Sequence, residues 1–374
     1  MHTKIRFHII FPVFFLSLSI RAQQNLPSDH QATAETISLY RHLKSLYGFM
    51  MGHQDDLAYG VGWKYISGKS DIREVTGDYP AIYGWELGRI EIDQPVNLDS
   101  VPFDKMRGFI REAYDRGGVI TISWHLNNPL TGKSAWEPSP GTVSSVLAAG
   151  EKHALYLSWL DKIAAFMLSL KGAHGELIPV IFRPFHEING NWFWWGGKNA
   201  SPEEIKQLYQ LTETYLRDKK NVHNLLYAYN TDRFSSKEEW LLRYPGDDWV
   251  DIGGFDIYQG NTIAKNDAFI AELDKSLALL ESICREKSKV PALTEFGYNG
   301  IPDSTWWTNV LNRGIGTHRI AYALAWRNAG RKNATQFEYY VPYPAQISAQ
   351  DFKKFFALDN TLFQRDVTAL KMYQ

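Results

Sequence analysis

Two glutamates, Glu187 and Glu295, each stand at the end of an apolar, strand-like run of residues. Glu187 ends the segment 183–187 (Arg-Pro-Phe-His-Glu), and Glu295 lies in the segment 294–297 (Thr-Glu-Phe-Gly). Burial among aromatic side chains raises the pKa of a carboxyl group, which suits Glu187 as a general acid. Glu295 is then expected to act as an ionised nucleophile. Two carboxyl groups in these two roles are the machinery that cleaves glycosidic bonds.

A metal site is the alternative interpretation of the dipeptide His186-Glu187. The zinc-protease motif requires a second histidine three residues after the glutamate, on a helix. That position holds Gly190, and the surrounding sequence has the character of a strand that runs into a loop. We therefore expect no metal ligands and no cofactor.

Short apolar runs typical of buried strands alternate with amphipathic, helix-like segments along the chain, without internal repeats. The predicted strands are 49–54, 80–87, 118–125, 178–187, 224–230, 250–258, 290–296 and 321–327. The clearest predicted helices are 104–116, 153–170, one that starts at Ser201, and 268–287. Eight such units predict an α/β fold, a single-domain (β/α)₈ TIM barrel over 23–374. An open, doubly wound sheet is the alternative, but no glycine-rich phosphate fingerprint follows the first strand.

Most of these predicted strands end in a polar or aromatic residue. The ends include His53, Glu86, His125, Glu187, Asn230, Tyr258, Glu295 and Arg327. In a parallel barrel all these ends converge at the C-terminal mouth, where active sites lie. The pattern therefore predicts one site that contains both glutamates, with Tyr258 near enough to hold Glu295.

The segment 183–195 resembles the acid/base segment of glycoside hydrolase family 26, the β-mannanase family. Shorter matches at 52–54, 123–125, 256–258, 294–297 and 325–327 follow in the same order, so the resemblance covers roughly 49–327. Related barrel families usually carry asparagine before the acid/base glutamate, so His186 favours family 26.

This resemblance implies a retaining endo-β-1,4-mannanase that acts on mannan or galactomannan without a cofactor. It implies Glu187 as acid/base and Glu295 as nucleophile, and it assigns substrate contacts to His125, His186, Trp192, Tyr258, Trp326 and Arg327. The alternatives are the same chemistry on β-1,3-xylan or mixed-linkage β-glucan, and a glycan-binding barrel without catalysis. Endo and exo action stay open, because the loop 127–150 or the insert after Asn328 could close one end of the cleft.

Several other residues have two interpretations. Glu86 is a rival carboxylate with Arg89 as an expected partner, and Asp55 and Asp56 are expected on a solvated loop. His53 and Asp256 suit either packing or function. The same holds for five tryptophans, Trp136, Trp194, Trp195, Trp306 and Trp307.

The N-terminus and the composition indicate an exported protein. Residues 1–22 have the basic start, the apolar stretch of about 12 residues and the small final residue of a signal peptide, and the stretch is too short for a membrane span. Cys284 is the single cysteine, so no intramolecular disulfide can form, and the net charge of −1 gives no indication of a nucleic-acid partner. We expect a monomer without a membrane span, located in the periplasm or the medium, with the periplasm favoured.

Overall fold

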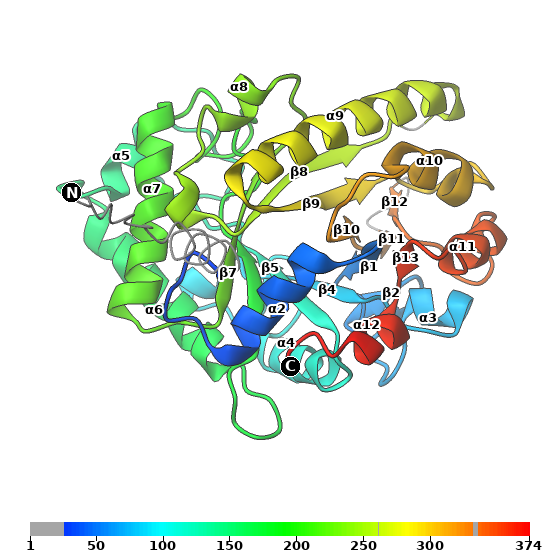
Figure 1. Cartoon of the computed structure of the whole chain (residues 1–374). Coiled ribbons are helices and arrows are strands. Elements are labelled where there is room, and N and C mark those ends of the chain that lie inside the picture. Colours follow the sequence, from blue (N-terminus) through cyan, green and yellow to red (C-terminus); the bar gives the residue numbers. More distant parts are fainter. Residues whose placement is uncertain (1–25, 261, 332–335) are drawn as a thin grey trace, which may run out of the picture.

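The structure, a computed structural model, describes residues 26–260, 262–331 and 336–374, and its centre is a closed barrel of eight parallel strands (Figure 1). The strands are Phe49–Gln54 (β1), Ile82–Glu86 (β4), Val119–Ser123 (β5), Val180–Arg183 (β6), Leu225–Thr231 (β7), Ile252–Tyr258 (β8), Val290–Gly297 (β9) and Tyr322–Ala325 (β10). Each pairs with its neighbour in chain order, and β10 closes the barrel by pairing with β1. The predicted (β/α)₈ barrel is confirmed.

All eight predicted strands are present, but the fourth is much shorter than 178–187. It ends at Arg183 because Pro184 has no N–H group with which to continue the ladder. Glu187 therefore lies on a loop four residues beyond the strand, whereas Glu295 lies within β9.

Helices surround the barrel, as Figure 1 shows. They are Asp71–Thr76 (α3), Phe103–Asp115 (α4), Thr142–Val146 (α5), His153–Ser169 (α6), Pro202–Thr214 (α7), Lys237–Leu241 (α8), Asn266–Lys287 (α9), Asn312–Ile315 (α10) and Ala349–Phe356 (α11). Helix α7 starts as predicted, because Ser201 and Glu204 form a capping box. Two π-helical segments, Tyr215–Lys219 and Trp307–Leu311, extend α7 and precede α10.

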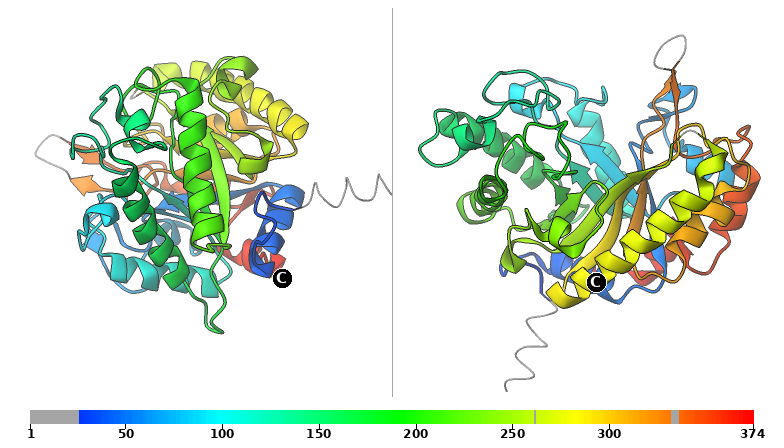
Figure 2. Two further views of the ribbon diagram at one scale, coloured as in Figure 1. Left: turned by 90° about the vertical axis from the view of Figure 1, so that its left-hand side faces the viewer. Right: turned by 90° about the horizontal axis from the view of Figure 1, so that it is seen from above.

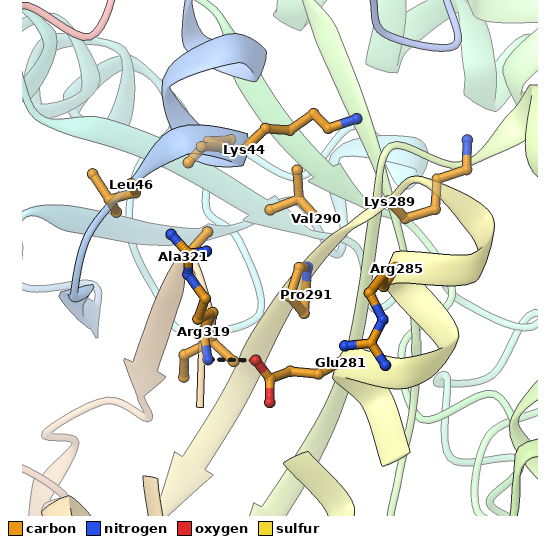
Figure 3. Close-up of a pocket in the computed structure, with 11 residues that line it drawn as sticks. Lys44, Leu46, Glu281, Arg285, Lys289, Val290, Pro291, Arg319 and Ala321 are labelled. Atoms are coloured by element: carbon orange, nitrogen blue, oxygen red, sulfur yellow. Dashed lines mark hydrogen bonds between the residues drawn. The ribbon is translucent and has the colours of Figure 1, made fainter. Parts of the chain in front are cut away.

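The N-terminal end of the barrel is sealed by Ala34–Ser45 (α2) and Gln364–Leu370 (α12). Leu39, Leu43 and Val367 belong to the same apolar cluster as the barrel interior, and Thr361–Leu362 (β13) pairs with the start of β1. A pocket of about 300 Å³ opens beside the first residues of β9 and β10, with Lys44, Arg285 and Arg319 around it (Figure 3). It lies at the opposite end of the barrel from the predicted mouth.

Two small hairpins extend the mouth. Tyr59–Gly60 (β2) pairs with Trp63–Lys64 (β3), and Gly330–Arg331 (β11) pairs with Phe337–Glu338 (β12). The second hairpin is the insert after Asn328, and Figure 2 shows it projecting from the barrel. Within the described residues, no helix is long and apolar enough to cross a membrane. The predicted signal peptide lies outside the described residues.

Candidate active site

A β-bulge directs the Glu295 side chain into the mouth of the barrel. Val290 and Ala292 point into the barrel interior, and simple alternation would turn residue 295 outward, toward the helices. The register with both neighbouring strands shifts between Leu293 and Phe296, so that Glu295 lies beside Asp256. Bulges of this kind re-aim a side chain and are common at active sites.

A buried arginine at the end of β6 joins the two acidic strands. Arg183 donates hydrogen bonds to Glu295 and to Asp256, the latter at 3.1 Å, and all three side chains are almost fully buried. The hydroxyl of Tyr258 donates to the second oxygen of Glu295 at 2.7 Å. Burial, followed by the charge of Glu295, raises the pKa of Asp256 well above its usual range. Both oxygens of Glu295 are thus bound by hydrogen-bond donors, one from a guanidinium group and one from a hydroxyl group.

Replacing this arginine should cost stability as well as activity. In Arg183→Met, the carboxyl groups of Glu295 and Asp256 lose their buried cation, and breaking such a pair costs about 3–5 kcal/mol. Urea denaturation followed by circular dichroism measures the change in the free energy of unfolding. Arg107→Met, which breaks an ion pair to the exposed Asp104, is the matched control and should leave the midpoint unchanged. Equal midpoints for both variants would contradict this account of Arg183.

The backbone and side chain of Glu187 are both constrained. Its φ angle of 50° lies in the left-handed region that side chains other than glycine rarely adopt, a form of strain that concentrates at functional sites. The indole N–H of Trp192 donates to the carboxyl group of Glu187 at 2.6 Å. Trp192 can fold back this closely because Gly190 has no side chain, since a Cβ atom there would lie 2.4 Å from the indole ring.

The carboxyl groups of Glu187 and Glu295 lie in electrostatically different surroundings at the mouth. Burial, followed by the nearby charges of Glu295 and Asp232, raises the pKa of Glu187 to about 8. Glu187 therefore holds a proton at neutral pH, whereas Glu295 contacts a guanidinium group. Two carboxyl groups whose environments favour opposite protonation states are the signature of an acid and a nucleophile.

One oxygen from each of Glu187, Asp256 and Glu295 lies within 4.8 Å of the other two. Such a group could hold a metal ion. However, the guanidinium of Arg183 contacts two of the three side chains and already supplies positive charge there. The close approach brings the two glutamates near enough to act on the same bond of a substrate.

A buried chain of hydrogen bonds links Glu86, His125 and His186. Glu86 accepts from His125 Nδ1 at 2.8 Å, and His125 Nε2 lies 2.9 Å from His186 Nε2. Although burial opposes it, Glu86 raises the pKa of His125, whereas burial and the charge of His125 lower that of His186. His125 is therefore the more basic ring of the pair, and His186 is the less basic one.

Aromatic side chains form the wall beside these histidines. Trp136, on the loop 127–150, stacks on His125 with ring centroids 4.9 Å apart and keeps 46 % of its surface exposed. Trp326 lies 6.4 Å from His125 and is partly buried. Exposed tryptophan rings next to two carboxyl groups fit a surface on which sugar rings stack.

Comparison with known proteins supports this geometry. The sequence profile of Glycosyl hydrolase family 26 matches residues 28–299. The chain belongs to this family. A solved family 26 β-mannanase from Bacteroides ovatus is 44 % identical, with a TM-score of 0.87, over 91 % of this chain and 98 % of that protein. The catalytic domain of a family 26 endo-β-1,4-mannanase from a Bacillus species is 33 % identical, with a TM-score of 0.85, over 93 % and 96 % of the two chains.

Two relatives with known sequences are also similar to this chain. A mannan endo-1,4-beta-mannosidase of Bifidobacterium adolescentis is 33 % identical over 88 % of this chain, and the match spans 34 % of that relative's length. One from Thermothelomyces thermophilus is 31 % identical over 65 % of this chain and 48 % of its own length. The chain thus spans less than half the length of these two relatives.

The structure brings five of the six expected substrate-binding residues to the mouth. Each contacts one of the two glutamates or another of the five: His125, His186, Trp192, Tyr258 and Trp326. Arg327 lies further along, with Nε 2.9 Å from Asp99 Oδ1.

Arg183 contacts Glu295 and Asp256 rather than the nearby Glu187. One expectation about a partner is wrong. Glu86 does not pair with Arg89, because His125, Ser123 and the backbone of Gly88 take its oxygens.

The loop after β1 is also buried rather than solvated. Tyr59 donates to Asp55 at 2.6 Å, and His53 contacts Asp56 at 2.8 Å, so both aspartates are fully enclosed. His53 is thereby a core histidine with an acidic partner. Four of the five tryptophans with open roles, Trp194, Trp195, Trp306 and Trp307, are fully buried and therefore pack in the core.

Asp99 is the residue at this site that the sequence analysis missed. It lies on the irregular segment between β4 and α4, is buried, and pairs with Arg327. Burial of Asp55, followed by the nearby charge of Asp99, raises the pKa of Asp55 well above its usual range. No strand end or motif marks Asp99, so no local signal could have found it.

Proposed function

We propose that this chain hydrolyses internal β-1,4-mannosidic bonds of mannan and galactomannan with retention of configuration, using Glu187 as acid/base and Glu295 as nucleophile. The observation that carries this proposal is the contrast between the two glutamates across a short gap. Glu187 keeps a proton up to about pH 8, whereas Arg183 and Tyr258 bind both oxygens of Glu295. The names of the relatives, mannan endo-1,4-beta-mannosidase and β-mannanase, support mannan as the substrate.

The geometry supports a double displacement. In the first step, Glu295 attacks the anomeric carbon while the proton of Glu187 passes to the leaving oxygen, giving a covalent glycosyl-enzyme. In the second step, Glu187 removes a proton from water as that water displaces Glu295. Inverting enzymes hold their carboxyl groups about 6.5–9.5 Å apart to admit a water molecule, and retaining enzymes about 5–5.5 Å apart. The approach within 4.8 Å favours retention.

The remaining contacts position the substrate. His125 and His186 would line the site of the cleaved sugar, and Tyr258 would steer the nucleophile. Trp192 and Trp326 would stack on sugar rings. Asp99 contacts Arg327 at Nε. We propose that the other N–H groups of Arg327 bind a sugar toward the non-reducing end.

The predicted signal peptide supports export of the chain, with the periplasm as the proposed location. A single compact barrel supports a monomer as the working form. Size-exclusion chromatography coupled to light scattering would test the second proposal.

Substrate and mode of action are tested by incubating the enzyme with mannan, galactomannan, β-1,3-xylan and mixed-linkage β-glucan. Products are separated by chromatography at short times. We expect early mannan oligosaccharides of mixed length and no products from the xylan or the glucan. A single disaccharide from the first time point would contradict internal attack, and turnover of only the xylan or the glucan would contradict the substrate. No product from any of the four would favour a glycan-binding barrel.

A further inference from the structure

A tyrosine outside the residues assigned above, Tyr340, packs against the partner of the proposed nucleophile. The rings of Tyr258 and Tyr340 meet edge to face, with centroids 5.8 Å apart and an interplanar angle of 76°. Gly297 lies beneath both rings, and a Cβ atom there would approach Tyr340 to 2.5 Å and Tyr258 to 2.6 Å. Only glycine at the end of β9 lets the two rings come together beside Glu295.

Tyr340 has a fixed place although it follows the projecting β11–β12 hairpin (Figure 2). The side-chain oxygen of the buried Asn328 accepts hydrogen bonds from the backbone N–H groups of Tyr340 and Val341, at 2.8 and 3.1 Å. The amide nitrogen of Asn328 donates to Asp71 at 2.7 Å, and Trp63 donates to the other oxygen of Asp71 at the same distance. The insert after β10 is thus tied to the hairpin after β1.

The hydroxyl group of Tyr340 makes no hydrogen bond among the described residues, and its ring is half-buried. Burial and the charges of Glu338 and Glu295 raise the pKa of Tyr340, and Arg327 lowers it. The group is therefore a neutral phenol, close enough to Glu295, Glu338 and Arg327 for their charges to act on it. A tyrosine with a packed ring and a half-buried phenol beside these charges is suited to contact a sugar.

We propose that Tyr340 is a further substrate-binding residue, whose ring braces Tyr258 and whose hydroxyl binds the sugar adjoining the cleaved one on the side of Arg327. This inference rests on the proposed function. It makes Tyr340 a specificity residue of the insert after Asn328, because a substrate that lacks the adjoining sugar gains nothing from the Tyr340 hydroxyl group.

The test is Tyr340→Phe, which keeps the ring and removes only the oxygen. It is assayed on 2,4-dinitrophenyl β-mannoside and on the corresponding β-mannobioside, which adds the adjoining sugar. We expect kcat/KM to fall roughly three- to tenfold on the mannobioside, the factor of one net hydrogen bond, mainly through KM. On the mannoside it should change less than twofold. Tyr343→Phe removes the same atom from the same insert and should behave as wild type on both substrates.

Equal losses on both substrates would show a structural role for Tyr340, and no loss on either would show that its hydroxyl touches no sugar. Both results would overturn the inference while leaving the proposed function intact. An inactive wild-type enzyme on both mannosides would instead reject the proposed function itself.

Discussion

Glu295→Ala is expected to lower kcat on mannan on the order of 10⁴-fold or more, because no covalent intermediate can form without the attacking carboxylate. Initial rates on mannan measure this effect. Circular dichroism should show an unchanged fold, since alanine leaves Arg183 free to pair with Asp256. Glu203→Ala, on the exposed face of α7, is the control glutamate and should keep full activity.

Azide separates the loss of a nucleophile from the loss of fold. Added to Glu295→Ala with 2,4-dinitrophenyl β-mannobioside, it should enter from the face that Glu295 occupied and yield the α-mannobiosyl azide. Nuclear magnetic resonance of the product reads the configuration. The β-azide from this variant would contradict the assignment, because it would mean that the nucleophile is still in place.

Glu187→Ala is expected to lower kcat/KM on mannan by about 10²–10⁴, the contribution of a general acid and base. The loss of rate in the first step, formation of the glycosyl-enzyme, should be far smaller for a dinitrophenyl leaving group, because that group departs without a proton. Azide should rescue this variant with formation of the β-azide, because the glycosyl-enzyme on Glu295 still forms.

The pH profile adds a second signature of Glu187. A general acid works only when protonated, and the pKa of Glu187 is raised to about 8, so wild-type kcat/KM should fall as the pH rises through about 8. In Glu187→Ala, this alkaline limb should disappear when the dinitrophenyl substrate is used. An alkaline limb that persists unchanged in the variant would assign it to another group.

The fold could be predicted because each strand is buried on both faces and forms a continuous apolar run in the sequence. The same logic found both glutamates, since parallel strands converge at one mouth. The shortened fourth strand was also foreseeable from Pro184, which ends the ladder and puts Glu187 on a loop.

Long-range contacts account for what the sequence could not predict. The bulge near Glu295 appears only in the register of β9 with β8 and β10. The two aspartates after β1 have the sequence of a solvated loop, yet both are buried. Asp55 lies close enough to Asp99 and Arg327, both distant in the chain, for their charges to shift its pKa. Burial likewise decided the role of tryptophans such as Trp194 and Trp306, because nothing in the local sequence separates a packed ring from one that binds sugar.

The most direct test of the double displacement is to trap its intermediate. The enzyme is incubated with 2-deoxy-2-fluoro-β-mannosyl fluoride, digested with pepsin, and its peptides are sequenced by mass spectrometry. The account predicts one added fluoromannosyl group, attached to Glu295. A label on Glu187 or Asp256, or an active enzyme that inverts configuration and takes up no label, would contradict it.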